Sequence, residues 1–216
     1  MTNTEMMQLL VERYPALAPL RCELERLTDA ICDAYRQGGK VMVAGNGGSA
    51  ADAEHIVGEL MKGFCLRRPL NEESKAALAA ADPVRGAHLG EVLQQGLPAI
   101  ALTGHAALST AFSNDCDPNA VFAQQVWGFG NKGDILIVIS TSGNAENLLL
   151  AATAARAKGI KVALLTGENG GKLANVCDFV LRAPAKETYQ VQEYHLPIYH
   201  TLCLVVENTF FGELSR

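Results

Sequence analysis

KVMVAGNGGSAADAEHIVGE, residues 40–59, is the stretch on which the interpretation of the fold depends. It consists of a short apolar run (41–44), a glycine-rich turn and a segment typical of a helix. Glycines let backbone N–H groups approach a ligand closely, and the amino terminus of a helix favours negative charge. Ser49 can cap that helix or bind a phosphate. The turn matches neither the GxGxxG dinucleotide motif nor the P-loop, so a plain tight turn is the alternative.

Further apolar runs repeat this pattern, each ending at glycine, polar or turn residues. They span 99–102, 135–139, 161–165 and 179–181. Their apolarity is continuous rather than alternating, which is typical of strands buried on both faces. Helical patterns lie between or after them, at 49–63, 118–128, 145–157 and 188–210. This alternation predicts an α/β fold in which helices flank a parallel sheet.

Two segments interrupt this alternation. Residues 1–38 contain two amphipathic helical patterns, one at 4–14 and a longer one that starts near Pro19. Residues 70–96 are rich in alanine and charge and are broken by a turn, which predicts an insertion of two short helices. We expect a single domain over the whole chain, with these segments as elaborations.

In parallel α/β folds, ligands bind beyond the carboxyl ends of the strands, near the point where the strand order switches. The turns expected to form the site are therefore those at 45–49, 103–104, 140–144 and 166–171.

Composition excludes several classes of function. The net charge of −5 argues against nucleic-acid and anionic-membrane partners, since these usually require a basic face. Six cysteines occur without a CxxC pair, which favours reduced thiols and a cytoplasmic location. The amino terminus has no basic segment ahead of an apolar run, so we expect no signal peptide. No apolar stretch is long enough to span a bilayer.

A second turn suited to an anion follows the run at 135–139. Ser140, Thr141 and Ser142 offer three hydroxyls beside Gly143, as binding a phosphate monoester requires. Serine and threonine also favour turns through their own local hydrogen bonds, which is the alternative. Two such turns on adjacent strands favour a phosphate site that both of them form.

Acid–base or metal chemistry is suggested by two helices. His55 and Glu59 are four residues apart and so share a helical face, although a histidine beside a surface carboxylate is the plainer interpretation. Gln192 and His200 lie on roughly one side of the carboxy-terminal helix. Two histidines with a glutamate and a glutamine suit a zinc site, and a glutamate opposite a histidine equally suits paired proton transfer. His195 is expected to be structural or interfacial.

Five ordered motifs carry a resemblance over nearly the whole chain except 70–96. They are AGNGGSAADAEHIVGEL (44–60), SNDCD (113–117), ISTSGNAENLL (139–149), ALLTGENGGKLA (163–174) and QVQEYH (190–195). Together they resemble the sugar isomerase (SIS) family, and within it the phosphoheptose isomerases. The resemblance implies a flavodoxin-like, three-layer α/β sandwich with a five-stranded parallel sheet. It also implies a homotetramer with sites at subunit interfaces.

The resemblance assigns roles to positions of this sequence. The implied zinc ligands are His55, Glu59, Gln192 and His200. Glu59 and His200 are also the implied catalytic base and acid. The implied substrate contacts are Asn46, Gly47, Gly48, Asn114, Asp115, Ser140, Thr141, Ser142 and Gln192, to which our interpretation of the first turn adds Ser49.

Some residues depart from the family pattern. Ala145 stands where these isomerases often have a further substrate-contacting serine, and Tyr189 and Gln190 replace an acidic residue and an arginine. These departures, with the insertion at 70–96, bear on the identity of the sugar.

The resulting hypothesis is an aldose–ketose isomerase of a phosphorylated sugar, with zinc as its cofactor. The expected reaction converts sedoheptulose 7-phosphate to D-glycero-D-manno-heptose 7-phosphate. One alternative is a non-catalytic SIS protein that binds phosphosugars or associates with a replication initiator, and it would show no turnover. Another is an isomerase of a different sugar phosphate, which a panel of substrates distinguishes.

Overall fold

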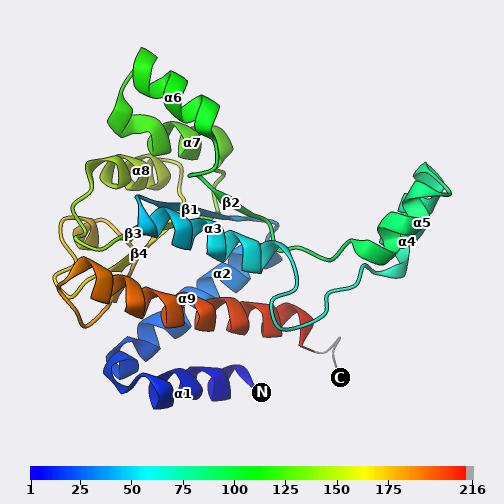
Figure 1. Cartoon of the computed structure of the whole chain (residues 1–216), viewed down its shortest axis with the longest axis horizontal. Coiled ribbons are helices and arrows are strands. Elements are labelled where there is room, and N and C mark those ends of the chain that lie inside the picture. Colours follow the sequence, from blue (N-terminus) through cyan, green and yellow to red (C-terminus); the bar gives the residue numbers. More distant parts are fainter. Residues whose placement is uncertain (213–216) are drawn as a thin grey trace.

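A five-stranded parallel sheet, in the order β2-β1-β3-β4-β5, forms the centre of the computed structural model, which describes residues 1–212 (Figure 1). The strands are β1 (Val41–Gly45), β2 (Ala99–Ala101), β3 (Ile135–Ser140), β4 (Lys161–Thr166) and β5 (Phe179–Arg182). All pairs are parallel, and β3 is buried along its whole length between β1 and β4. The predicted parallel sheet is confirmed.

Helices cover both faces of this sheet. One face packs against α2 (Arg21–Arg36), α3 (Gly48–Met61) and α9 (Thr188–Phe211). The other face packs against α7 (Val121–Phe129) and α8 (Glu146–Ala157). Strand residues alternate between the two cores: Val41 and Val43 belong to the first, whereas Met42 and Ala44 belong to the second. This alternation explains why the strands are apolar at every position.

The amino-terminal helices complete the first layer. α1 (Asn3–Arg13) begins with a capping box between Thr2 and Glu5 and packs on α9. A 3-10 helix, η1 (Pro15–Leu20), then leads into α2. The second helix therefore begins at Arg21 rather than near Pro19, because the two prolines lie within the 3-10 helix.

The insertion projects from the body of the molecule as a helical hairpin, which we call the arm (residues 70–96; Figure 1). It consists of α4 (Glu72–Ala81) and α5 (Arg85–Val92), as expected, and an antiparallel bridge between Pro69 and Gln94 closes its base. α4 buries none of its residues, and α5 buries only Gly86 and Gly90. The arm therefore adds little to the core of its own chain.

One helix was not predicted. α6 (Ala106–Asp115) has no buried residue, and its Ser109, Thr110 and Ser113 are of types that favour caps and turns over helix interiors. The remaining elements are the short 3-10 helices η2 (Pro118–Ala120) and η3 (Leu173–Asn175). Within residues 1–212, none of the helices combines the length and apolarity needed to cross a bilayer.

Candidate active site

A cavity of about 320 Å³ lies at the carboxyl ends of β1 and β3, where the strand order switches direction. Three helices begin at its wall: α3 at Gly48, α8 just after Ala145, and α9 at Thr188. The first N–H groups of a helix have no intrahelical partner, and the helix dipole adds positive potential there. The convergence of three such ends favours an anion.

Most of the predicted substrate contacts line this cavity. They are Asn46, Gly47, Gly48, Ser49, Ser140, Thr141, Ser142 and Gln192. The turns at 45–49 and 140–144 therefore form one site, as the sequence suggested, with hydroxyl groups on one side and a helix amino terminus on the other.

The backbone of the first turn requires its glycines. Gly47 has φ of +56°, and a Cβ at Gly48 would lie 2.6 Å from Nε2 of Gln192. Gly47, not Ser49, occupies the N-cap position of α3, so the alternative in which Ser49 caps this helix is excluded. Ser49 instead lies within the first turn of the helix, where it lines the cavity.

A reciprocal amide pair joins the two turns. Nδ2 of Asn46 donates to Oδ1 of Asn147 at 3.0 Å, and Nδ2 of Asn147 donates to Oδ1 of Asn46 at 2.9 Å. The Asn46 side chain thus holds the start of α3 against α8. Asn147 was not singled out from the sequence, although it lies inside one of the five motifs.

The other two expected turns do not line the cavity. Oγ1 of Thr103 donates to Glu54 at 3.0 Å, on the exposed side of α3. The turn at 166–171 supports the turn at 140–144 from behind, since a Cβ at Gly143 would lie 2.0 Å from the carbonyl oxygen of Gly170. Its role is therefore to shape the site rather than to contact a ligand.

Asn114 and Asp115 lie apart from the other predicted contacts. They form the exposed carboxyl end of α6, where Nδ2 of Asn114 donates to Oδ1 of Asp115 at 2.8 Å. Neither residue lines the cavity of its own chain. Conversely, Thr188 lines the cavity but was missed, because only its position at the start of α9 reveals it.

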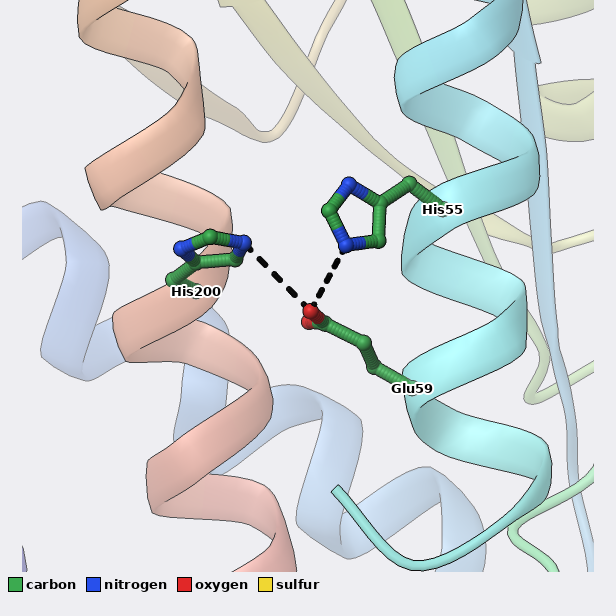
Figure 2. Close-up of side chains that lie close together, drawn as sticks. All are labelled: His55, Glu59 and His200. Atoms are coloured by element: carbon green, nitrogen blue, oxygen red, sulfur yellow. Dashed lines mark ion pairs between the residues drawn. The ribbon is translucent and has the colours of Figure 1, made fainter. Parts of the chain in front are cut away.

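A second group of side chains lies farther along α3 and α9. Nε2 of His55 is 3.0 Å from Oε1 of Glu59, and Nε2 of His200 is 3.4 Å from the same oxygen (Figure 2). The two helices run in the same direction, because Gly48 meets Gln192 near their starts and Glu59 meets His200 farther on. Each helix therefore extends from the cavity to this His–Glu–His group.

The group has the geometry and the unmet hydrogen-bonding capacity of a cation site. Its ligand atoms all lie within 4.8 Å of one another. Two atoms bound about 2.1 Å from a tetrahedral zinc ion lie about 3.4 Å apart, close to the separations observed here. Oε2 of Glu59 and Nε2 of His200 are buried without a hydrogen-bond partner. Two histidines and a glutamate are a ligand set of catalytic zinc sites, so the residues fit the ion.

Burial shapes the protonation of this group. It raises the pKa of the Glu59 carboxyl, an effect that the Cys203 thiol and the His55 ring partly offset. Burial also lowers the pKa of His200, and the neighbouring His55 adds to that shift. Both effects favour neutral forms, namely a carboxyl that can exchange a proton and an imidazole with a free lone pair.

Two further residues of α9 complete the description. Gln192 lines the cavity at the ends of β1 and β3, which we call the anion cavity. It is eight residues from His200, which corresponds to about 12 Å along the helix. Its assignment as a metal ligand stays a prediction. His195 is fully buried, with Nε2 3.4 Å from the carbonyl oxygen of Thr166, as expected of a structural histidine. Burial lowers its pKa to about 4.

Comparison with known proteins agrees with this geometry. The SIS domain model matches residues 16–86 and 76–167, and the two matches meet inside the arm. Phosphoheptose isomerase from Burkholderia pseudomallei is 39% identical over 194 residues, which cover 90% of this chain and 85% of that protein. The enzyme of that name from Rhodospirillum rubrum is 42% identical over 173 residues, covering 80% and 78%. The structure of a phosphoheptose isomerase from Francisella tularensis is similar with a TM-score of 0.73 at 34% identity, covering 95% and 94%.

Proposed function

The chain belongs to the SIS domain family, and from that premise we propose that it is an aldose–ketose isomerase that converts sedoheptulose 7-phosphate to D-glycero-D-manno-heptose 7-phosphate. One observation carries the proposal: the anion cavity and the His–Glu–His group lie on the same two helices. A phosphate held where α3 and α9 begin leaves the rest of the sugar to extend toward Glu59. The names of the relatives support the same reaction.

The distance between the two parts favours a long substrate. At 1.5 Å per residue, His55 lies about 10 Å and Glu59 about 16 Å beyond Gly48 along α3. The carbons that exchange hydrogen are at the far end of the substrate from its phosphate. A seven-carbon chain reaches this group better than a five-carbon one.

In the proposed reaction, Glu59 takes a proton from C1 of the ketose and returns it to C2. His200 gives a proton to the oxygen on C2 and accepts one from the hydroxyl on C1, so that an enediol forms and collapses to the aldose. The raised pKa of Glu59 suits this exchange, because a proton-transfer group works best with a pKa near the working pH. The lowered pKa of His200 keeps its ring neutral, so that it can accept the proton of the C1 hydroxyl and deliver it to the oxygen on C2.

His55, Glu59 and His200 would hold zinc in this proposal, with Gln192 as the further ligand that the family pattern implies. A nitrogen of His200 bound to the ion could not also transfer a proton, so the two roles of His200 would belong to different states of the site. The bound ion supplies Lewis-acid stabilisation of the negative charge that develops on the sugar oxygens. Oε1 of Glu59 faces both imidazoles, whereas Oε2 is buried. Glu59 therefore has to loosen its bond to the ion, or share its carboxylate with it, when it takes the proton.

We also propose a cytoplasmic homotetramer with sites shared between subunits. Asn114 and Asp115 can contact a substrate bound in the cavity only if another copy brings its α6 there. Analytical ultracentrifugation that finds only monomers would contradict this arrangement.

Replacement of Glu59 by glutamine tests the mechanism. The side chain keeps its shape but loses the ability to accept the proton, so we expect kcat with sedoheptulose 7-phosphate to fall by about 10²–10⁴-fold. Glu54→Gln is the matched control, since it changes an exposed carboxylate on the same helix and should leave kcat unchanged. Near-normal turnover by Glu59→Gln would contradict the role of this residue.

A further inference from the structure

The ring of His55 is held at both of its nitrogens. Nε2 faces Glu59, as described, and Nδ1 lies 3.0 Å from the hydroxyl oxygen of Tyr199. That hydroxyl donates to Oδ1 of Asp52 at 3.3 Å. Asp52 is three residues before His55 on α3, and Tyr199 directly precedes His200 on α9. The contacts thus form a chain, Asp52–Tyr199–His55, that ends at the His–Glu–His group.

The number of protons in this chain determines which nitrogen of His55 carries hydrogen. A tyrosine hydroxyl has a single proton, and here it is directed to the carboxylate of Asp52. The hydroxyl oxygen can then only accept from His55, which requires a proton on Nδ1. The lone pair of a neutral His55 is consequently on Nε2, the atom that faces Glu59 and His200.

Burial of the partners makes this arrangement persistent. Tyr199 is 1% exposed, and its ring packs edge-on against both His55 and His200. The hydroxyl therefore has little access to water as an alternative partner. Partners of this kind fix the tautomer and orientation of histidines that bind metals, and their loss typically weakens metal binding by about 10–100-fold.

We propose that Tyr199 and Asp52 are positioning residues, which hold the proton of His55 on Nδ1 and thereby present Nε2 as a metal ligand. The inference rests on the proposed function in one respect, namely that the His–Glu–His group binds zinc. It adds two residues to the site that were not singled out from the sequence, although Asp52 lies inside the first of the five motifs.

Tyr199→Phe is the direct test, because it removes the hydroxyl and keeps the packed ring. With zinc-loaded protein and a competing chelator, we expect the Kd for zinc to rise about 10–100-fold. Tyr35→Phe is the matched control: Tyr35 is also a tyrosine with a buried hydroxyl, but this hydroxyl has no hydrogen-bond partner. Its removal should leave the Kd unchanged. Equal zinc affinity of Tyr199→Phe and the wild type would overturn the proposal.

Asp52→Ala separates the chain of contacts from a general loss of packing. If Asp52 acts through Tyr199, the double variant should bind zinc no more weakly than Tyr199→Phe alone. If the losses of zinc affinity in the two single variants add in full in the double variant, the two residues act independently. That result would contradict the Asp52–Tyr199–His55 chain of contacts.

The tautomer itself provides a readout that needs no metal. In the full chain with zinc removed, at a pH where imidazole is neutral, the Glu59 carboxylate competes for the proton at Nε2. ¹⁵N NMR should therefore show a larger fraction of His55 with its proton on Nδ1 in the wild type than in Tyr199→Phe. A His55→Gln spectrum assigns the resonance. A wild-type chain that binds no zinc would contradict the metal site of the proposed function, whereas an equal fraction with the proton on Nδ1 in the wild type and in Tyr199→Phe would contradict the positioning role.

Discussion

His195 and His200 lie on the same helix but in different environments. His195 is fully buried beside the carbonyl oxygen of Thr166, whereas His200 is about one-third exposed at the group it shares with Glu59. Burial lowers the pKa of His195 to about 4, against an ordinary value of 6.5. The unfolded chain therefore binds more protons than the folded one between these two pH values.

This difference predicts acid sensitivity. The stability contributed by neutral His195 is complete above about pH 6.5 and declines as the pH falls toward 4, by about 3 kcal/mol in total. His195→Gln can still donate to Thr166 but does not titrate. We expect the wild type to lose more unfolding free energy than this variant between pH 7 and pH 4.5, as measured by urea denaturation. Equal losses of unfolding free energy in the wild type and in His195→Gln would contradict the assignment of this acid sensitivity to His195.

Single residues differ in how far the sequence could identify them. His55 and Glu59 on one helix, and Gln192 and His200 on another, were suggested by their spacing and their position in the chain, and the family resemblance assigned them as ligands. Tyr199, Asn147 and Thr188 could not be nominated in this way. Their roles depend on which helices lie side by side, and no local pattern records that information.

At the scale of elements, a buried ion pair anchors the segment between α3 and the arm. The carboxylate of Glu207 on α9 accepts from the N–H groups of Phe64, Cys65 and Leu66 and from the guanidinium of Arg68. Arg68 in turn donates to the carbonyl oxygens of Leu60 and Glu59. The pair therefore satisfies the carboxyl end of α3, the helix that carries Glu59.

Glu207→Gln should be strongly destabilising. It leaves the guanidinium of Arg68, a residue that is 1% exposed, without its counter-charge. Removal of one partner from a buried ion pair typically costs about 3–5 kcal/mol of unfolding free energy. Asp33→Asn, which breaks an exposed pair with Arg36, should change stability little. The unfolding free energies of both variants and the wild type can be measured by chemical denaturation. A small loss of unfolding free energy in Glu207→Gln would show that the ion pair with Arg68 is dispensable.

The elements themselves were largely predictable, because burial leaves a clear pattern. All five strands were found from continuous apolar runs, and the arm was found from its alanine-rich texture and central turn. α6 was missed because it buries none of its residues and, unlike α4, lacks the alanine- and charge-rich composition that marked the arm. The start of α2 was misplaced because η1 precedes it.

At the scale of the whole molecule, α3 and α9 connect two sites that the sequence could describe only separately. Their common start at the cavity and their later meeting at Glu59 give the direction in which the proposed substrate would lie. The parallel order of the sheet explains why both turns of the cavity come together, since adjacent parallel strands end at one edge. Where Asn114 and Asp115 lie relative to a second copy of the chain depends on how the subunits assemble. Motifs within one chain do not record this.

The isomerisation of sugar phosphates of different length tests the central proposal most directly. Initial rates should be measured for the purified, zinc-loaded chain with five-, six- and seven-carbon ketose phosphates, with formation of the aldose phosphate as the readout. We predict that kcat/KM is highest for sedoheptulose 7-phosphate, because its reacting carbons reach Glu59 while its phosphate occupies the cavity. Turnover of none of these substrates by zinc-loaded protein would contradict the account.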